Sequence, residues 1–297
     1  MVDGKWIISE PAFEADVICP KYKIWPWNGH RRFAYDLVRL VRPKRFVELG
    51  TYWGTSFFAF CQAVKDFNLE TECVAIDTWK GDDHTGPYET EALDTFNRVN
   101  KEIFEKINVR PLKMTFKEAL SFIEEDSIDI LHIDGCHDYD PVKEDYLTWL
   151  PKLEKEGIIL FHDVADSVEY ESVRFWKEIS ENVPNMRFQH SWGLGVLFPK
   201  GDYYFKQMRS DNFEDKMKIY EYRSDLDYAL VRIDILKGIV ESKNKTIAEK
   251  TEAMSFLEKK IQDLQRSIDE CQNTLRRFQS SPLFRLFQNF RKAFKTC

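Results

Sequence analysis

The feature that most constrains the fold is an alternation of short apolar runs and amphipathic stretches between residues 45 and 199. The apolar runs are typical of buried strands, and the stretches between them have the spacing of helices. Strands and helices that alternate in this way predict an α/β domain, with a parallel sheet covered by helices on both faces. The predicted strands are 45–49, 72–76, 108–112, 128–133, 157–162 and 192–199, and the predicted helices are 55–67, 89–107, 116–123, 141–153 and 171–183.

The length of 297 residues suits one such domain of about 200 residues and a further part. We predict the α/β domain at 29–205, after an irregular aromatic segment at 1–28 whose last residue, Asn28, caps the first helix. In a doubly wound sheet of this kind, ligands bind at the carboxyl ends of the strands.

Charge, cysteines and hydropathy exclude several classes of protein. A net charge of −7 argues against a nucleic-acid binder, so we expect no nucleic-acid partner. The six cysteines form no CxxC pair and suit a reducing compartment. The chain begins without the apolar region of a signal peptide and contains no run long enough to span a membrane. We therefore expect a cytoplasmic protein.

The segment 215–279 carries a heptad repeat. Every seventh residue from Ile219 to Leu275 is apolar, and so is most of a second column that starts at Leu236. This pattern predicts a coiled coil and hence a homo-oligomer, with β-branched residues and leucines that favour a dimer. Lys243 and Lys250 interrupt the second column and leave the number of strands open. The alternative is one long helix that folds back on the domain.

The last segment, 281–297, is a predicted basic amphipathic helix. Ser281 can cap it and Pro282 suits its first turn. Such a helix is typical of contact with a membrane surface, here the inner face of the cytoplasmic membrane. The alternative is that it packs on a partner or on another domain. Its aromatic stripe is Phe284, Phe287, Phe290 and Phe294, and its basic residues are Arg285, Arg291, Lys292 and Lys295.

The ends of the first two predicted strands carry acids and glycines. Glu48 closes the first strand, and Gly50 and Gly54 bracket the turn into the next helix, where glycine lets the backbone approach a ligand closely. Asp77 follows the second strand, where a carboxylate suits the two hydroxyls of a ribose. The alternative for Asp77 is a loop or helix cap.

The fourth and fifth predicted strands also end in polar residues. Asp134, Gly135 and His137 follow the fourth strand, and His162 and Asp163 follow the fifth. Because these strands are neighbours in the predicted sheet, Asp134, His162 and Asp163 are expected together. Oxygen and imidazole ligands could hold Mg²⁺, Mn²⁺ or Ca²⁺ there. The alternative is a hydrogen-bonded polar cluster without a metal.

Four motifs, "VELGTYWGTS", "AIDTWKGDDHTGPY", "LHIDGCHDYDPVKED" and "IILFHD", carry a resemblance to class I S-adenosylmethionine-dependent methyltransferases. The chain looks most like the sugar and small-molecule O-methyltransferases that have an IDGxHxY motif, over about residues 26–200. The resemblance implies a Rossmann-like seven-stranded sheet with a reversed last strand. It also implies metal ligands at Asp134, His162 and Asp163. His162 departs from the usual all-carboxylate or Asp/Asn set, which argues against Mg²⁺ and leaves Mn²⁺ or no metal open. The implied donor-binding residues are Glu48, Gly50, Thr51, Gly54, Ser56 and Asp77.

The motifs also predict a mechanism. A sugar hydroxyl loses its proton during methyl transfer, and His137 is the candidate base, with Asp134 anchoring the donor or a metal. Trp79, in the polar loop 77–88, is expected to cover the adenine, and His84 in the same loop is a second candidate base. The alternative for His137 is a structural helix cap.

The predicted function is an S-adenosylmethionine-dependent O-methyltransferase that acts on a sugar hydroxyl of a bacterial surface polysaccharide, where a terminal methyl group could cap the chain. The coiled coil and tail would hold several active sites at the membrane. One alternative is an O-methyltransferase for a small secondary metabolite, and another is an inactive scaffold with a methyltransferase-like domain. The acceptor is therefore a glycan or a small molecule.

Overall fold

The fold centres on a seven-stranded sheet in the order β5-β2-β1-β6-β7-β9-β8. The computed structural model describes residues 5–82, 86–87, 90–210 and 212–293. β9 runs antiparallel to both of its neighbours, and the other pairings in the sheet are parallel. The strands are β1 (Arg45–Leu49), β2 (Glu72–Asp77), β5 (Asn108–Lys113), β6 (Ile128–Ile133), β7 (Leu153–His162), β8 (Asn185–Phe188) and β9 (Leu194–Leu197).

This sheet confirms the predicted Rossmann-like arrangement with a reversed last strand. β8 is absent from the predicted strands. It has four residues, of which only Met186 and Phe188 are buried, so its two-residue alternation is too short to recognise. The loop 77–88, predicted to contain no regular element, holds the short antiparallel pair β3 (Gly81–Asp82) and β4 (Gly86–Pro87). His84 lies outside the described residues.

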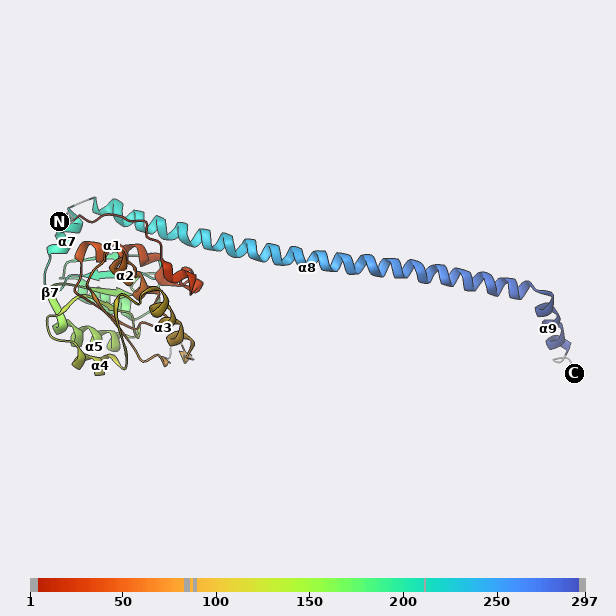
Figure 1. Ribbon diagram of the computed structural model, residues 1–297, viewed down its shortest axis with the longest axis horizontal. Helices are drawn as coiled ribbons and strands as arrows, with labels where there is room; N and C mark the ends of the chain where they lie inside the picture. The colour runs from red at the N-terminus through yellow and green to blue at the C-terminus, as the bar shows by residue number, and fades with distance from the viewer. Residues whose placement is uncertain (1–4, 83–85, 88–89, 211, 294–297) are drawn as a thin grey trace. The chain divides into compact units, whose positions relative to one another are not determined.

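Two apolar cores lie on opposite faces of the sheet, because successive residues of a strand point to opposite sides. In β1, Phe46 belongs to one core and Val47 to the other. The first core includes residues of α1 (Arg31–Val41), α2 (Thr55–Asp66) and α3 (Glu91–Ile103). The second includes residues of α4 (Phe116–Ala119), α5 (Tyr139–Trp149) and α6 (Ser172–Ser180). Figure 1 shows α1 and α2 on one side of the sheet and α4 and α5 on the other.

The N-terminal segment is part of this core. It forms three short 3-10 helices, η1 (Glu14–Val17), η2 (Pro20–Lys23) and η3 (Pro26–His30), and buries Trp6, Tyr22 and Trp27. The Trp6 indole N–H donates to the Tyr220 hydroxyl at 3.0 Å, which donates to Asp36 at 2.7 Å.

The predicted cap of the first helix is wrong. Asn28 lies inside η3, and His30 precedes α1. The Asn28 side-chain oxygen instead accepts two hydrogen bonds from the Arg31 guanidinium, at 2.9 and 2.6 Å. A buried cation needs such acceptors. The Asn28 side chain therefore accepts from the Arg31 guanidinium and does not cap the backbone N–H groups at the start of α1.

The chain divides into two compact units, residues 1–232 and 233–297. Helix α8 (Phe213–Ser280) begins in the first unit, where Tyr220 and Ser224 are buried, and continues through the second, which also contains α9 (Pro282–Ala293). The short α7 (Tyr203–Arg209) precedes it. Heptad residues of the second unit, from Ile233 to Phe278, are exposed. The coiled coil therefore stays a prediction.

None of the helices in the described part of the chain combines the length and the apolar character needed to cross a membrane.

Candidate active site

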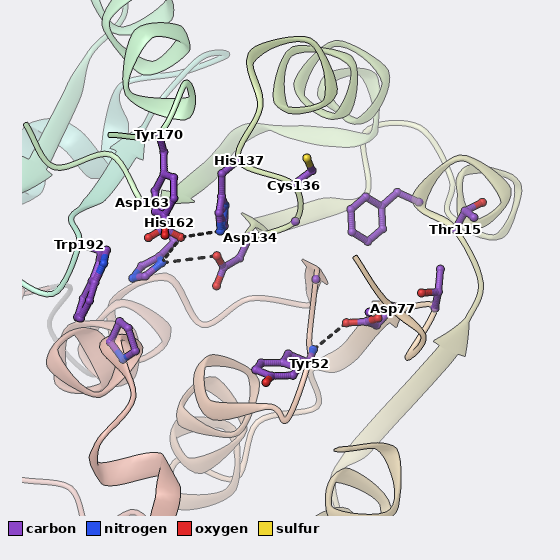
Figure 2. A pocket seen from close by; sticks show the side chains of 16 residues that line it. Tyr52, Asp77, Thr115, Asp134, Cys136, His137, His162, Asp163, Tyr170 and Trp192 are labelled. Atoms are coloured by element: carbon purple, nitrogen blue, oxygen red, sulfur yellow. Dashed lines mark hydrogen bonds and ion pairs between the residues drawn. The ribbon is translucent and has the colours of Figure 1, made fainter. Parts of the chain in front are cut away.

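A cavity of about 570 Å³ opens at the carboxyl ends of β1, β2, β6 and β7 (Figure 2). This is the edge of the sheet at which a doubly wound fold binds ligands. On one side the cavity is lined by Gly50, Tyr52, Asp77, Thr115 and Phe116. On the other side it is lined by Asp134, His137, His162, Asp163, Tyr170 and Trp192.

The turn after β1 brings backbone close to the cavity. Gly50 has φ 90°, a conformation that favours glycine, and a Cβ there would lie 2.0 Å from the carbonyl oxygen of Asp134. Gly54 also has a positive φ, 91°, but it starts α2 and packs on Phe58 without lining the cavity. Gly50 is thus the glycine that a bound ligand would approach.

Asp77 ends β2 as a fixed carboxylate. Its Oδ2 accepts from the Tyr52 N–H at 2.8 Å and its Oδ1 from the Trp79 N–H at 2.7 Å. The second bond is the loop cap of the alternative interpretation. An ionised carboxylate offers about four acceptor sites, so Asp77 is of a kind that can accept from ligand hydroxyls in addition to backbone N–H groups.

Glu48 is placed differently from its predicted role. Its side chain is fully buried, does not line the cavity, and receives the Nδ1–H of His132 at 2.8 Å. The Trp27 indole N–H donates to the other ring nitrogen of His132, which fixes that tautomer. Burial raises the pKa of Glu48 above its ordinary value. The described contacts of Glu48 are structural and do not support a contact with the donor.

Four other predicted donor-binding residues also do not line the cavity: Thr51, Gly54, Ser56 and Trp79. The Trp79 indole donates to the Tyr52 carbonyl at 2.8 Å and packs on Phe96, with ring centroids 5.4 Å apart. The predicted adenine cover by Trp79 therefore finds no support in its described contacts. Phe116, which follows β5 and lines the cavity, is better placed to cover a base.

Asp134, His162 and Asp163 converge as the strand order predicts. Their ligand atoms all lie within 4.8 Å of one another. His162 Nδ1 is 2.9 Å from Asp163 Oδ2 and 3.5 Å from Asp134 Oδ1 (Figure 2). Asp163 has φ 60°, an unfavourable backbone conformation for aspartate that places its carboxylate at the cluster.

The hydrogen bonds of His162 show what this cluster can bind. Its Nε2 is 3.1 Å from the Ser191 carbonyl oxygen, which can only accept, so Nε2 carries a proton. The other ring nitrogen, Nδ1, then faces two carboxylates and needs a proton or a cation. Burial alone would lower the pKa of His162, but Asp163 and Asp134 outweigh it and raise the pKa to about 10. A divalent ion can take the place of that proton, because metal-bound histidines commonly donate their second N–H to a backbone carbonyl.

His137 lies beside the cluster. Its Nε2 is 3.2 Å from Asp163 Oδ2, and its ring packs against that of Tyr170, with centroids 4.8 Å apart and the planes tilted by 41°. Ser172, at the start of α6, holds both loops: its N–H donates to the His137 carbonyl at 2.9 Å and its hydroxyl to the Asp163 carbonyl at 2.6 Å. Asp163 thus orients two histidines, and His137 is held within the cavity as predicted.

Position 135 requires a glycine because a neighbouring ring leaves no room for a side chain. Its φ is not positive, and a Cβ there would meet the Phe116 ring at 2.6 Å. A side chain at this position is therefore excluded by Phe116, which lies against the Cα of Gly135.

The sequence prediction missed several lining residues, among them Tyr52, Thr115, Phe116, Tyr170 and Trp192. Thr115 and Phe116 follow β5, so the strand-end rule applied to 108–112 could have found them. Tyr52, Tyr170 and Trp192 sit in loops, and no periodicity marks them.

One family match covers the part of the chain that contains most of the cavity. Residues 47–164 match a methyltransferase domain family. The matched range starts in β1 and ends just after Asp163, and so contains the lining residues of the cavity except Pro26, Tyr170 and Trp192. The sheet around this matched range has seven strands, and its last strand is antiparallel to its neighbours, as in a Rossmann-like fold with a reversed last strand.

A curated relative and several solved structures are also similar. An uncharacterized protein, y4gI, of Sinorhizobium fredii is 43% identical over 173 residues, which is 58% of this chain and 19% of that protein. The chain thus spans about a fifth of its relative. The S-adenosylhomocysteine-bound methyltransferase PaMTH1 of Podospora anserina is 16% identical, with a TM-score of 0.47 over 65% of this chain and 91% of its own. An O-methyltransferase of Bacillus cereus in complex with S-adenosylhomocysteine is 13% identical, with a TM-score of 0.46 over 65% and 93%.

Proposed function

We propose that the chain is an S-adenosylmethionine-dependent O-methyltransferase. The observation that carries the proposal is that one cavity joins the Gly50 turn and Asp77 to the Asp134–His162–Asp163 cluster and His137. The Gly50 turn lets a nucleoside approach the backbone closely, and Asp77 offers it a carboxylate. The Asp134–His162–Asp163 cluster and His137 offer metal-binding and acid–base side chains. The match to a methyltransferase domain over residues 47–164 supports this assignment.

S-adenosylmethionine supplies an electrophilic methyl group when it is bound. Transfer of that group is an in-line displacement, so holding the two reactants in line supplies much of the rate. Asp77 would accept the ribose hydroxyls, Gly50 would admit the rest of the donor against the backbone, and Phe116 would cover the base. Figure 2 shows Asp77 on the side of the cavity away from Trp192.

His137 would accept the proton of the attacking hydroxyl. His137 Nε2 lies 3.2 Å from Asp163 Oδ2, so an Nε2–H directed at that carboxylate would leave the lone pair of the ring on Nδ1 and orient the imidazole. This is the arrangement of a base that a carboxylate orients. Tyr170 packs beside the ring and limits its rotation.

Asp134, His162 and Asp163 would hold a divalent ion, with Mn²⁺ favoured over Mg²⁺ because one ligand is an imidazole nitrogen. Such an ion, when bound, polarises the acceptor hydroxyl. The fit rests on His162, whose Nε2–H is already donated to Ser191 so that Nδ1 is directed at the two carboxylates.

For the acceptor we propose a sugar hydroxyl, and specifically one on a bacterial surface polysaccharide. The choice is supported by the resemblance of Ile133–Tyr139 to the IDGxHxY motif of sugar O-methyltransferases. The heptads of α8 would form a homo-oligomer, and the basic amphipathic α9 would contact the inner face of the membrane on which such glycans are assembled. A small secondary metabolite is the alternative acceptor.

The assignment of the base is tested with His137→Ala. Loss of a general base lowers turnover by roughly 10²–10⁴-fold, whereas binding of S-adenosylmethionine should stay within a factor of two to three because His137 lies away from Asp77. Turnover is measured as S-adenosylhomocysteine released with methyl pyranosides and with catechol as acceptors. Cys136→Ser, a change at the neighbouring lining residue, is the control. Unchanged turnover in His137→Ala would contradict the assignment.

A further inference from the structure

The loop between β8 and β9 is strained where it meets the cavity. Ser191, Trp192 and Gly193 have φ values of 52°, 65° and 92°, three left-handed residues in succession. Only the glycine adopts this conformation without cost, and a Cβ at Gly193 would lie 2.2 Å from the Ala165 nitrogen. A bulky residue such as Trp192 is unusual there, and strain of this kind is found where function requires it.

Several hydrogen bonds hold the loop in this conformation. The Trp192 carbonyl accepts from the Ala165 N–H at 2.8 Å, and the Gly193 N–H donates to the His190 carbonyl at 2.8 Å. The Ser191 carbonyl accepts from His162 Nε2 at 3.1 Å, and the ring nitrogen of His30 lies 3.2 Å from the same oxygen. The loop is therefore fixed, and it is tied directly to the histidine of the candidate metal cluster.

The strain places an indole at the mouth of the cavity. Trp192 is 44% exposed and lines the cavity together with Tyr170, which is 36% exposed. Figure 2 shows Trp192 beside His162 and Tyr170 above Asp163, both on the side of the cluster away from Asp77. Burial of a tryptophan normally stabilises a fold, so an indole that is half in water on a strained backbone gains most from contact with a ligand.

We propose that Trp192 and Tyr170 form the binding platform for the sugar ring of the acceptor, with the CH face of a pyranose stacked on the Trp192 indole. This inference rests on the proposed methyltransferase function and names the residues that choose its substrate. A pyranose has an apolar face and hydroxyls at its rim. Stacking on Trp192 directs those hydroxyls toward Asp163 and His137, which accept hydrogen bonds.

The exposure of the platform favours the end of a glycan over a small enclosed acceptor. Sites for small ligands bury most of the ligand surface, and their aromatic walls are buried with it. Trp192 and Tyr170 are open to solvent, so one face of a ring is covered while the rest of the acceptor extends into water. The anchoring of Ser191 by His162 further predicts that the platform and the metal cluster are positioned as one unit.

The test uses Trp192→Asn. Asparagine tolerates a left-handed backbone, so this variant removes the indole without adding strain and should fold at least as stably as the parent. Trp192→Phe keeps an aromatic face. Tyr203→Asn is the matched control, because Tyr203 is 54% exposed and does not line the cavity. Binding of the methyl pyranosides of glucose, galactose, mannose and rhamnose is followed by saturation-transfer NMR, with and without S-adenosylhomocysteine.

We expect at least one pyranoside to bind, with its dissociation constant raised about tenfold by Trp192→Asn and about threefold or less by Trp192→Phe and Tyr203→Asn. Equal binding by Trp192→Asn and the parent would overturn the platform. Absence of binding for every pyranoside would also overturn it. So would a result in which catechol binds, Trp192→Asn weakens that binding, and no sugar binds. None of these results depends on methyl transfer, whereas failure to bind S-adenosylmethionine would overturn the proposed function and leave the platform result standing.

Discussion

At the scale of single residues, the candidate site depends on carboxylates that each serve several partners. Asp163 contacts both His137 and His162, and Asp77 fixes both Tyr52 and Trp79 through their backbone N–H groups. Such shared acceptors hold loops from different strands in one geometry, which a methyl transfer between two bound molecules requires. The Asp163 carboxylate is the more critical of the two, because its loss would leave both histidines without a common partner.

A second aspartate, Asp145 on α5, predicts how stability depends on pH. Burial, and then the neighbouring Glu144, raise the pKa of Asp145 to about 7. Its pKa is thus higher in the folded than in the unfolded chain, so folding favours the protonated form. The stabilisation is complete below about pH 4 and is lost as the pH rises through about 7. Because the side chain is half-buried, we expect the loss to be roughly 1–2 kcal/mol.

Asp145→Asn removes this loss. The variant and the parent should have similar free energies of unfolding in urea at pH 4, and the variant should be more stable at pH 8 by roughly 1–2 kcal/mol. Asp140→Asn, at an exposed carboxylate of the same helix, controls for the change in net charge. A difference that is the same at both pH values would show that Asp145 titrates as an ordinary surface carboxylate.

At the scale of elements, the part of α8 that follows Arg232 has an apolar face that is exposed. Its heptad residues are between 46% exposed at Ile233 and 62% exposed at Met254. β-Branched residues in one column and leucines in the other favour a parallel dimer, in which identical positions face each other. In such a dimer, Lys243 and Lys250 would each face the same residue of the second copy. The repulsion between these like charges would weaken the centre of the in-register coiled coil, and it would weaken a pair with a shifted register less.

Cys271 tests this arrangement, because it occupies the second heptad column. In a parallel in-register dimer, Cys271 faces Cys271 of the second copy within reach of a disulfide. Mild oxidation should therefore give a covalent dimer that Cys271→Ser abolishes, while the variant stays dimeric by light scattering. A monomer in solution would contradict the coiled coil. A dimer that does not cross-link through Cys271 would contradict the parallel register.

At the scale of the whole molecule, the sequence predicts the sheet better than the parts around it. The bounds of β1 and β6 agree with the predicted 45–49 and 128–133, because buried parallel strands are continuous apolar runs. The segment 1–28 was predicted to be irregular, and its burial of Trp6, Tyr22 and Trp27 could not be foreseen because short 3-10 helices have no long apolar period.

In the candidate site, too, the sequence could place some residues and not others. Asp77, Asp134 and Asp163 could be placed together from the sequence, because the carboxyl ends of neighbouring parallel strands meet at one edge. Glu48 follows the same rule and yet is buried against His132, since the side on which a strand residue points depends on register. Trp192 could not be foreseen, because its place depends on hydrogen bonds from His162 and Ala165 that form only in the folded chain.

The most direct test of the central claim is calorimetric titration of the protein with S-adenosylmethionine, with and without Mn²⁺ or Mg²⁺. The account predicts micromolar binding that Asp77→Ala weakens at least about tenfold, since the variant loses the ribose acceptor and the carboxylate that orders Tyr52. Ser9→Ala, at a residue that does not line the cavity, is the control. An absence of binding under every condition, or equal binding by Asp77→Ala, would contradict the assignment of this cavity to a methyl donor.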